Sequence, residues 1–314
     1  MTARYPEARR VVLITGAFSG IGQAIALAMA EAGWLVYASG RSLAKSGRLR
    51  VAAEAHGLPV RPIVMDVTDE QSIDAAMARI RGEAGRLDAL VNNAGLAVHG
   101  AVTEISNAQY RLQFDTNTIG PIAVSRAALE IMREAGHGRI INISSYMGKV
   151  SFPASGAYAA SKHALEALSD AMRLEIRLAG PEYHVVLVQV PAIRTHLGDN
   201  AIYAEYGDSA HSLYGRFNAM ARDFVAQAYD GKPGPEIVAR VVLRAAEAAR
   251  PKPRYSVNLE SSVILALRRF LPDRAFDGLV LLRAPRLKRQ IAARKRACPA
   301  PADGMGVQHG DAPR

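Results

Sequence analysis

The chain has 314 residues, 49% of them apolar and 22% charged, and its 39 Lys and Arg exceed its 29 Asp and Glu by ten. This composition is typical of a globular protein and excludes disordered, collagen-like and solenoid classes. Cys298 is the only cysteine, so no intrachain disulfide or cysteine-based zinc site is possible. No apolar run approaches the roughly 18 residues of a membrane-spanning helix, and we expect a cytoplasmic protein.

The positive charge is concentrated at the C-terminal end. Residues 268–314 hold eleven basic and four acidic residues, a net charge of +7, which leaves +3 for residues 1–267. A near-neutral body joined to a basic terminal segment argues against a nucleic-acid footprint spread over the whole protein.

In chain order, short apolar strands alternate with helical patterns. We predict strands over residues 11–15, 34–39, 62–65, 87–91, 139–143 and 185–190, and helices that include residues 43–56, 107–134 and 157–178. Apolar strands of this kind are typical of a parallel sheet covered on both faces. The predicted fold class is therefore α/β, a doubly wound parallel sheet of the Rossmann type in a single domain, with a C-terminal helical extension.

The predicted organisation has three parts. Residues 8–257 form the sheet domain, and they include a long connection, 194–216, that lacks a steady period and is expected to cover a ligand site. Residues 258–298 form a basic amphipathic extension. Residues 299–314, rich in Pro, Gly and polar residues, are expected to be disordered.

A glycine-rich turn follows the first strand, with the spacing Gly16, Gly20, Gly22. Such a turn presents backbone N–H groups and the positive end of a helix to a pyrophosphate, as in dinucleotide-binding proteins. The alternative is an ordinary strand-to-helix turn.

The residues after the second strand bear on the choice between NAD and NADP. NAD binders usually carry an acidic residue here for the ribose 2′-hydroxyl. From Ala32 to Ala53 the chain has no Asp or Glu, whereas Arg41 can pair with a 2′-phosphate. NADP is thus favoured over NAD, and the alternative is that Arg41 is a solvated loop residue.

Tyr158 and Lys162 are four residues apart, a spacing that places both on one helix face. A nearby ammonium and the positive helix end favour the phenolate, so this tyrosine can exchange a proton at neutral pH. Taken alone, such a pair is also found on solvated helix faces.

These motifs lie in the order and spacing of the short-chain dehydrogenase/reductase family, which residues 8–257 resemble. The matching segments are Thr15–Gly22, Asn92–Gly95, Asn117, Ser145, Tyr158–Lys162 and Pro191–Thr195. The resemblance implies that Tyr158 is the general acid-base and that Ser145, in preference to Ser144, orients the substrate oxygen. It implies that Lys162 binds the nicotinamide ribose and lowers the tyrosine pKa, and that Asn117 holds a water on the proton path.

Together with Arg41, the resemblance implies a cofactor site, and one residue departs from the family pattern. The site comprises Gly16, Ser19, Gly20, Ile21, Gly22, Arg41, Asp66, Asn93, Tyr158, Lys162, Ile193 and Thr195. The departure is Ala192, where the family usually has glycine; we expect it to be tolerated. The eight histidines show no metal-ligand spacing, and no metal site is expected.

The resemblance implies an oxidoreductase that transfers a hydride between NADP(H) and a secondary alcohol, ketone or aldehyde. Residues 161–166 and 271–274 resemble the hydroxysteroid and retinol dehydrogenase branch, which suggests a lipophilic substrate. The apolar side chains of the connection after Thr195 either cover such a ligand or pack between helices. A non-enzymatic dinucleotide sensor or membrane scaffold on the same fold is the alternative.

The extension leaves several partners open. Apolar positions followed by a basic cluster, over residues 263–296, suit an anionic membrane surface, here the inner one. Packing on the same or another subunit is an alternative, and no aromatic side chain lies among the basic residues 283–296 to stack on nucleic acid. The helices beginning near Asn107 and Ala157 resemble those with which the family forms homo-oligomers.

Overall fold

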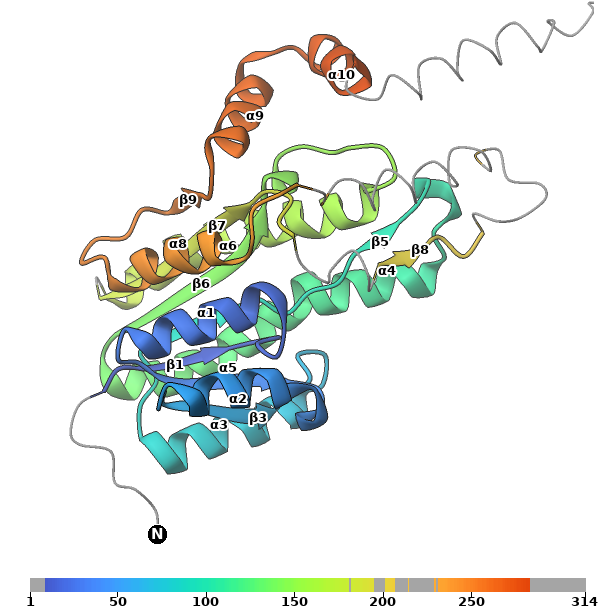
Figure 1. The fold of residues 1–314 in the computed structure, drawn as a ribbon. Coiled ribbons are helices and arrows are strands. Elements are labelled where there is room, and N and C mark those ends of the chain that lie inside the picture. The colour runs from blue at the N-terminus through green and yellow to red at the C-terminus, as the bar shows by residue number, and fades with distance from the viewer. Residues whose placement is uncertain are drawn as a thin grey trace, which may run out of the picture. The chain divides into compact units, whose positions relative to one another are not determined.

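The fold is given by a computed structural model, which describes residues 9–180, 182–194, 201–206, 214, 229 and 231–282. Strands and helices alternate along most of the chain (Figure 1). The strands are β1 Val11–Ile14, β2 Leu35–Gly40, β3 Val60–Val64, β4 Ala89–Asn92, β5 Val98–His99, β6 Gly138–Ser145, β7 Tyr183–Val190, β8 Ile202–Tyr203 and β9 Arg254–Ser256. The α-helices are α1 Gly20–Glu31, α2 Gly47–Ala55, α3 Glu70–Ala84, α4 Asn107–Phe114, α5 Gly120–Ala135, α6 Gly156–Ala179, α8 Glu236–Glu247, α9 Leu259–Phe270 and α10 Asp273–Leu282.

Seven strands form one parallel sheet in the order β3-β2-β1-β4-β6-β7-β9. The chain builds outward from β1 to β3 and then returns to place β4 on the other side of β1, so the strand order reverses between β1 and β4. In doubly wound sheets a ligand binds beyond the carboxyl ends of the strands at such a reversal. The predicted fold class is confirmed.

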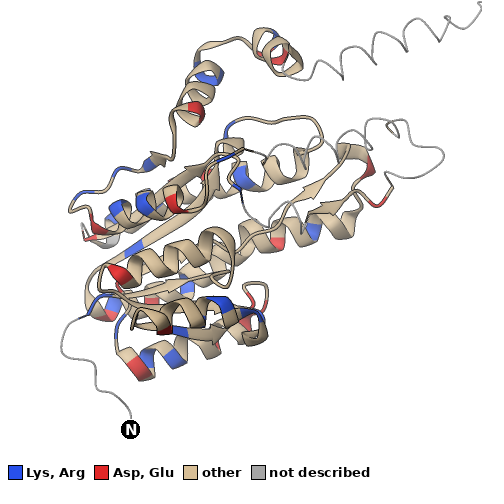
Figure 2. Cartoon of the chain, viewed as in Figure 1, with Lys and Arg blue, Asp and Glu red and all other residues tan. Residues whose placement is uncertain are grey.

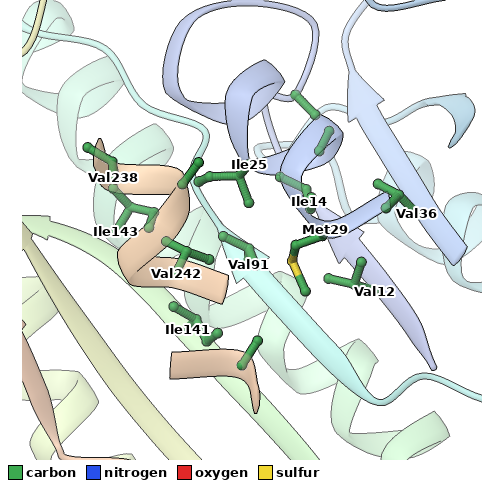
Figure 3. Packing of buried hydrophobic residues seen from close by; sticks show 14 of the residues in the cluster. Val12, Ile14, Ile25, Met29, Val36, Val91, Ile141, Ile143, Val238 and Val242 are labelled. Atoms are coloured by element: carbon green, nitrogen blue, oxygen red, sulfur yellow. The ribbon is translucent and has the colours of Figure 1, made fainter. Parts of the chain in front are cut away.

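Helices bury both faces of the sheet, as the apolar strands require. Alternate residues of β1 point to opposite faces: Val12 and Ile14 pack with α1 and α8, and Val11 and Leu13 pack with α3 and α5. Figure 3 shows the first of these cores, where Ile25 and Met29 of α1 and Val238 and Val242 of α8 meet the strand residues.

The seventh strand, β9, is absent from the predicted elements, and so is α8. β9 has only three residues, which are partly buried or exposed, and it lies at the edge of the sheet beside β7. A strand this short and this exposed has no apolar run that would predict it. The Arg139 side chain of β6 donates hydrogen bonds to the carbonyls of Ala245, Ala246 and Ala248, and so fixes the C-terminal end of α8 to the sheet.

Two predicted helices differ in detail. The helix expected over 107–134 is divided into α4 and α5 by a π-helical turn, Asp115–Ile119. The helix expected over 43–56 begins with a 3-10 turn, Leu43–Ser46, before α2. At α3, Asp69 is the capping residue, because its carboxylate accepts from the N–H groups of Gln71 and Ser72.

The chain divides into two compact units, Met1–Arg269 and Phe270–Arg314. The first unit contains α9 up to Arg269, so the predicted extension from residue 258 begins within the first unit. Basic and acidic residues are interspersed over the described part of this unit (Figure 2), in keeping with its small net charge. No helix in the described ranges has both the length and the apolar composition needed to cross a bilayer.

Candidate active site

Two turns meet where the strand order reverses. The glycine-rich turn follows β1, and Asn93 follows β4. The Thr15 hydroxyl oxygen joins them by accepting from the N–H groups of Asn93 at 2.9 Å and Ala94 at 2.8 Å. In return, the Asn93 side-chain amide donates to the carbonyls of Thr15 and Gly16. Residues 78 positions apart in the chain thus form one rigid edge of the site.

The glycine positions of this turn are required by close backbone approach. A Cβ on Gly22 would lie 2.3 Å from the Gly16 carbonyl oxygen, and a Cβ on Gly16 would lie 2.9 Å from the Ala94 Cα. Gly16 and Gly20 also have positive φ values of 63° and 55°. The turn is therefore compact enough for a ligand to reach its backbone.

The N-terminal end of α1 suits an anion. Ser19 stands at the N-cap but makes no side-chain capping hydrogen bond, and the first turn of α1 has no acidic residue. The backbone N–H groups of this turn, which includes Gly20 and Ile21, therefore point outward beside the positive helix end. This arrangement fits a pyrophosphate, which is the group the sequence predicts here.

Gly40 stands at the end of β2, where NAD binders usually carry a carboxylate. A Cβ there would lie 2.4 Å from the buried Phe18 ring, so the packing excludes an acidic side chain at this position. Arg41 follows immediately, is exposed, and forms no ion pair within the described part of the chain. Its guanidinium is available to a phosphate.

Ser145 and Tyr158 come from adjacent elements, the end of β6 and the first turn of α6. The Ser145 hydroxyl donates to the Val190 carbonyl at 3.1 Å and accepts from the Met147 N–H, also at 3.1 Å, which fixes its position. Just before α6, Ala154 adopts the left-handed conformation with φ of 64°, which turns the chain into the helix. Ser144, the alternative hydroxyl, lies near Glu166 and Gly148.

Lys162 lies one helical turn after Tyr158 and is buried. Its Nζ donates to the Ile143 carbonyl on β6 at 2.8 Å and lies 5.8 Å from the centre of the Tyr158 ring. Burial lowers the pKa of Lys162 to about 8, against the opposing effect of the Glu166 carboxylate. The predicted pair is thus brought together on one helix face, next to Ser145.

The acidity of Tyr158 differs from the sequence expectation. Burial raises the pKa of the Tyr158 phenol, the phenols of Tyr229 and Tyr146 add to this rise, and a hydrogen bond with Ser145 opposes it. The Lys162 Nζ donates to the Ile143 carbonyl and lies 5.8 Å from the ring centre, and its charge does not outweigh the effect of burial on the Tyr158 pKa. In this arrangement Tyr158 is the protonated partner, suited to giving a proton.

Asn117 lies in the π-helical turn between α4 and α5 and is fully buried. Its side chain accepts from the Leu96 N–H and donates to the Leu96 carbonyl, both at 2.9 Å, and its amide also contacts the Ser161 hydroxyl at 3.3 Å. Ser161 is the residue before Lys162. Asn117 therefore joins the turn after β4 to α6 next to Lys162, at a π turn of the kind that often marks functional sites.

The structure describes Asp66 and Ile193 among the remaining residues of the predicted cofactor site. Asp66 is partly buried just after β3, and its carboxylate accepts from the N–H and hydroxyl of Thr68 at 3.0 and 2.8 Å. Ile193 is buried after β7, with Ala192 beside it in the connection to Arg194. Thr195 lies outside the described residues. Within the described ranges, no group of three or more His, Cys, Asp or Glu side chains could hold a metal ion.

Part of the connection expected to cover the site is described. β8 pairs in parallel with β5, and the Gln109 side chain of α4 holds it by donating to the Tyr203 carbonyl and accepting from the Glu205 N–H. Ala204 packs into a small apolar cluster with Val98, Ile105 and Ala157, the residue before Tyr158. This anchors one segment of the connection beside the start of α6.

Some residues near the site were not predicted from sequence. Tyr146 follows Ser145 and packs edge-on against Phe152, with ring centres 5.9 Å apart. Tyr229, far along the chain, is close enough to Tyr158 to affect its pKa. Adjacency to Ser145 is a signal that could have found Tyr146, whereas no spacing or motif points to Tyr229.

Comparison with known proteins is consistent with this geometry. A family model for short chain dehydrogenases matches residues 10–204. The uncharacterized oxidoreductase YbbO of Escherichia coli is 33% identical over 273 residues, covering 87% of this chain and 94% of the relative. The 3-ketodihydrosphingosine reductase of Bacteroides thetaiotaomicron is 38% identical over 198 residues, covering 62% of this chain and 68% of the relative. A short chain dehydrogenase/reductase structure from Burkholderia phymatum, in complex with NAD, aligns with a TM-score of 0.74 and 25% identity, covering 85% of this chain and 95% of that one.

Proposed function

Because the chain is an oxidoreductase of the short-chain dehydrogenase/reductase family, we propose that it transfers a hydride between NADP(H) and a secondary alcohol, ketone or aldehyde, with Tyr158 as the general acid-base. The observation that carries this proposal is the shared anchoring of Ser145, Tyr158 and Lys162 on β6 and α6, beside the glycine-rich turn. A nicotinamide dinucleotide is the cofactor that the family and the NAD-bound structural neighbour support.

The residues at the strand reversal fit the cofactor. The first turn of α1 and the Gly16 turn would hold the pyrophosphate, Asp66 the adenine, and Lys162 the nicotinamide ribose. Ile193 and Thr195 would hold the carboxamide. When bound, the nicotinamide supplies or accepts the hydride.

The protein's own groups handle the substrate oxygen. In the reducing direction, the Ser145 hydroxyl turns its hydrogen from the Val190 carbonyl to the substrate carbonyl oxygen, and Tyr158 gives that oxygen its proton. The raised pKa of Tyr158 keeps the proton on the phenol until this step. Lys162 then stabilises the phenolate that is left, and Asn117 holds the water from which the proton is restored.

Two features support NADP over NAD. Phe18 packs where a carboxylate on residue 40 would stand, and Arg41 is exposed beside it. A guanidinium can bind a 2′-phosphate in a bidentate manner, which gives charge-assisted hydrogen bonds. The basic side chains of Lys45 and Arg48, also exposed, add to the positive field.

A lipophilic carbonyl compound is the proposed substrate class. The connection after Ile193 carries apolar and aromatic side chains, of which Ile202 and Tyr203 are partly buried and Tyr206 and Tyr214 are exposed. One relative is named a 3-ketodihydrosphingosine reductase, which is in keeping with a ketone substrate.

We further propose that the protein is a homo-oligomer and that it binds the inner membrane surface peripherally. Large apolar side chains are exposed on the helices that the family uses for assembly: Leu112 on α4, Ile119 before α5, and Leu168, Leu174 and Leu178 on α6. Static light scattering after size-exclusion chromatography measures the number of subunits.

The support for membrane binding is a set of exposed apolar side chains with the basic cluster following them: Val263 and Leu267 on α9, and Leu279 and Leu282 on α10.

The catalytic proposal is tested by following NADPH oxidation at 340 nm with a panel of ketosteroids, retinoids, aliphatic ketones and sugars. We expect turnover of at least one lipophilic carbonyl compound and a clear preference for NADPH over NADH. Binding of NADPH without turnover of any carbonyl or alcohol would instead support a non-enzymatic dinucleotide sensor.

A further inference from the structure

Glu166 is a buried carboxylate one helical turn beyond Lys162, so the two side chains lie on the same face of α6. Its side chain is only 1% exposed. One carboxylate oxygen accepts from the Gln189 amide of β7 at 3.1 Å, and the other accepts from the Arg254 Nε of β9 at 2.9 Å. Lys149 approaches the same oxygen at 3.6 Å.

The charged groups around Glu166 lie on β9, on α6 itself and in the segment between β6 and α6 that carries Lys149. Arg254 also pairs with Asp170 at 2.6 Å, and Asp170 pairs with Arg173 at 3.2 Å. The Arg254 guanidinium therefore bridges two carboxylates on successive turns of α6. Burial deprives a carboxylate of its hydration, so a buried carboxylate stays charged only when cations and hydrogen-bond donors stabilise it. Arg254, Lys149 and Gln189 do so here.

The buried Lys162 ammonium likewise needs a negative charge nearby to remain charged. It is buried, and its hydrogen-bond partner is the neutral carbonyl of Ile143. The Tyr158 ring centre is 5.8 Å from the Lys162 Nζ, and Tyr158 carries no negative charge while its phenol is protonated. Burial lowers the pKa of Lys162 to about 8, and Glu166 is the group that opposes this.

We infer that Glu166 is a positioning residue whose buried carboxylate balances the buried Lys162 ammonium from the next turn of α6, and that Arg254 on the seventh strand holds Glu166 in place. The inference rests on the proposed function, in which a charged Lys162 binds the cofactor ribose and stabilises the Tyr158 phenolate. It also gives the edge strand β9 a role in the chemistry of the site, through the Arg254 side chain.

The test measures the titration of Lys162 directly. Competitive acetylation of the folded protein between about pH 6 and about pH 10, read by mass spectrometry of the peptide containing Lys162, reports the fraction of free amine. Glu166→Gln removes the negative charge while keeping the size of the side chain. We expect Glu166→Gln to move the midpoint of the Lys162 titration about one pH unit lower. The pH above which NADPH affinity falls, measured by fluorescence, should move in the same direction.

Two further variants separate charge from structure. Asp170→Asn breaks an ion pair to the same Arg254 but leaves Glu166 charged, so the Lys162 midpoint should stay where it is. Arg254→Gln removes the cation that holds Glu166 in place and stabilises its charge, so the midpoint should fall, as in Glu166→Gln. If Glu166→Gln does not fold, the direction of the Arg254→Gln shift decides the question.

An unchanged Lys162 midpoint in folded Glu166→Gln, or in Arg254→Gln, overturns the inference. The acetylation measurement needs no cofactor or substrate. A wild-type protein that neither binds NADPH nor reduces a carbonyl therefore refutes the proposed function, while the titration of Lys162 can still be read.

Discussion

Lys162 donates from its Nζ to the backbone carbonyl of Ile143, two residues before Ser145, at 2.8 Å. This bond fixes the face of α6 that carries Tyr158 and Lys162 to the strand that carries Ser145. Because β6 is buried between β4 and β7, it holds Ser145 and the bonded end of Lys162 in fixed positions. The spacing of Tyr158, Lys162 and Ser145 is therefore set by the sheet.

Replacing Arg41 should change the cofactor preference. Arg41→Asp removes the proposed phosphate partner and adds a like charge, so we expect NADPH affinity to fall about 10- to 100-fold, as loss of charge-assisted hydrogen bonds would predict. NADH affinity should change much less. Fluorescence titrations with both nucleotides measure this, with Arg50→Asp on α2 as the control of equal charge change. Equal losses for the two nucleotides would show that Arg41 does not read the 2′-phosphate.

A methyl group on Gly22 should damage the phosphate turn. Its Cβ would lie 2.3 Å from the Gly16 carbonyl oxygen and 2.5 Å from the Asn93 amide nitrogen, so the turn must shift. We expect Gly22→Ala to weaken NADPH binding at least about tenfold. Gly82→Ala is the matched control, because nothing lies within 4 Å of a Cβ there, in the interior of α3. It should raise the free energy of unfolding by about 0.5–1 kcal/mol and leave binding unchanged. Equal NADPH binding by both variants would argue against the Gly16–Gly22 turn as the phosphate site.

Asp88 should contribute stability that acid removes. It accepts from the Val11 N–H at 2.7 Å, from His137 at 2.7 Å and from Arg86. Burial tends to raise the pKa of Asp88, but these hydrogen bonds outweigh it and the pKa is lowered. A lowered pKa means that the stabilisation is present above the unfolded value of about 4 and is lost as the pH falls through the folded value.

Asp88→Asn should therefore lower the free energy of unfolding at pH 7 by about 2–4 kcal/mol, since a buried, paired charge is removed. The difference from wild type should shrink as the pH approaches about 3. Urea denaturation at a series of pH values measures both effects. Asp74→Asn, on the exposed face of α3, should stay within about 0.5 kcal/mol of wild type. A difference between Asp88→Asn and wild type that is independent of pH would contradict the assignment.

Membrane binding should depend on the basic cluster. A chain ending at Leu282 keeps α9 and α10 and loses the basic residues after them. We expect full-length protein to sediment with anionic vesicles and the shortened chain to remain in the supernatant, since each basic residue near the surface contributes about 1 kcal/mol. Neutral vesicles are the control. Equal sedimentation of both chains with anionic vesicles would disprove the role of this segment.

The elements that the sequence predicts well are those with strong local patterns. Apolar runs predicted β1, β2, β3, β4, β6 and β7, and the Gly16–Gly22 spacing identified the turn at the strand reversal. These features are visible because strand burial and backbone approach restrict the residues allowed at each position. The four-residue spacing of Tyr158 and Lys162 likewise predicts their common helix face.

The features that the sequence does not predict depend on contacts between residues far apart in the chain. β9 is held by its pairing with β7 and by the Arg254 ion pairs to α6, and neither leaves a local pattern in three residues. The π-helical turn at Asn117 is stabilised by hydrogen bonds to Leu96 and Ser161, which no periodicity reveals. For the same reason the direction of the Tyr158 pKa was expected wrongly: burial and the partner of Lys162 are tertiary properties.

The central claim is that Tyr158 supplies the proton in a dinucleotide-dependent carbonyl reduction, and Tyr158→Phe tests it most directly. On the best substrate from the NADPH screen, kcat should fall about 10²- to 10⁴-fold, while the dissociation constant of NADPH stays within about threefold of wild type. Tyr110→Phe, which removes a hydroxyl bonded to the Val102 carbonyl, should retain wild-type turnover. Wild-type kcat in Tyr158→Phe would contradict the account.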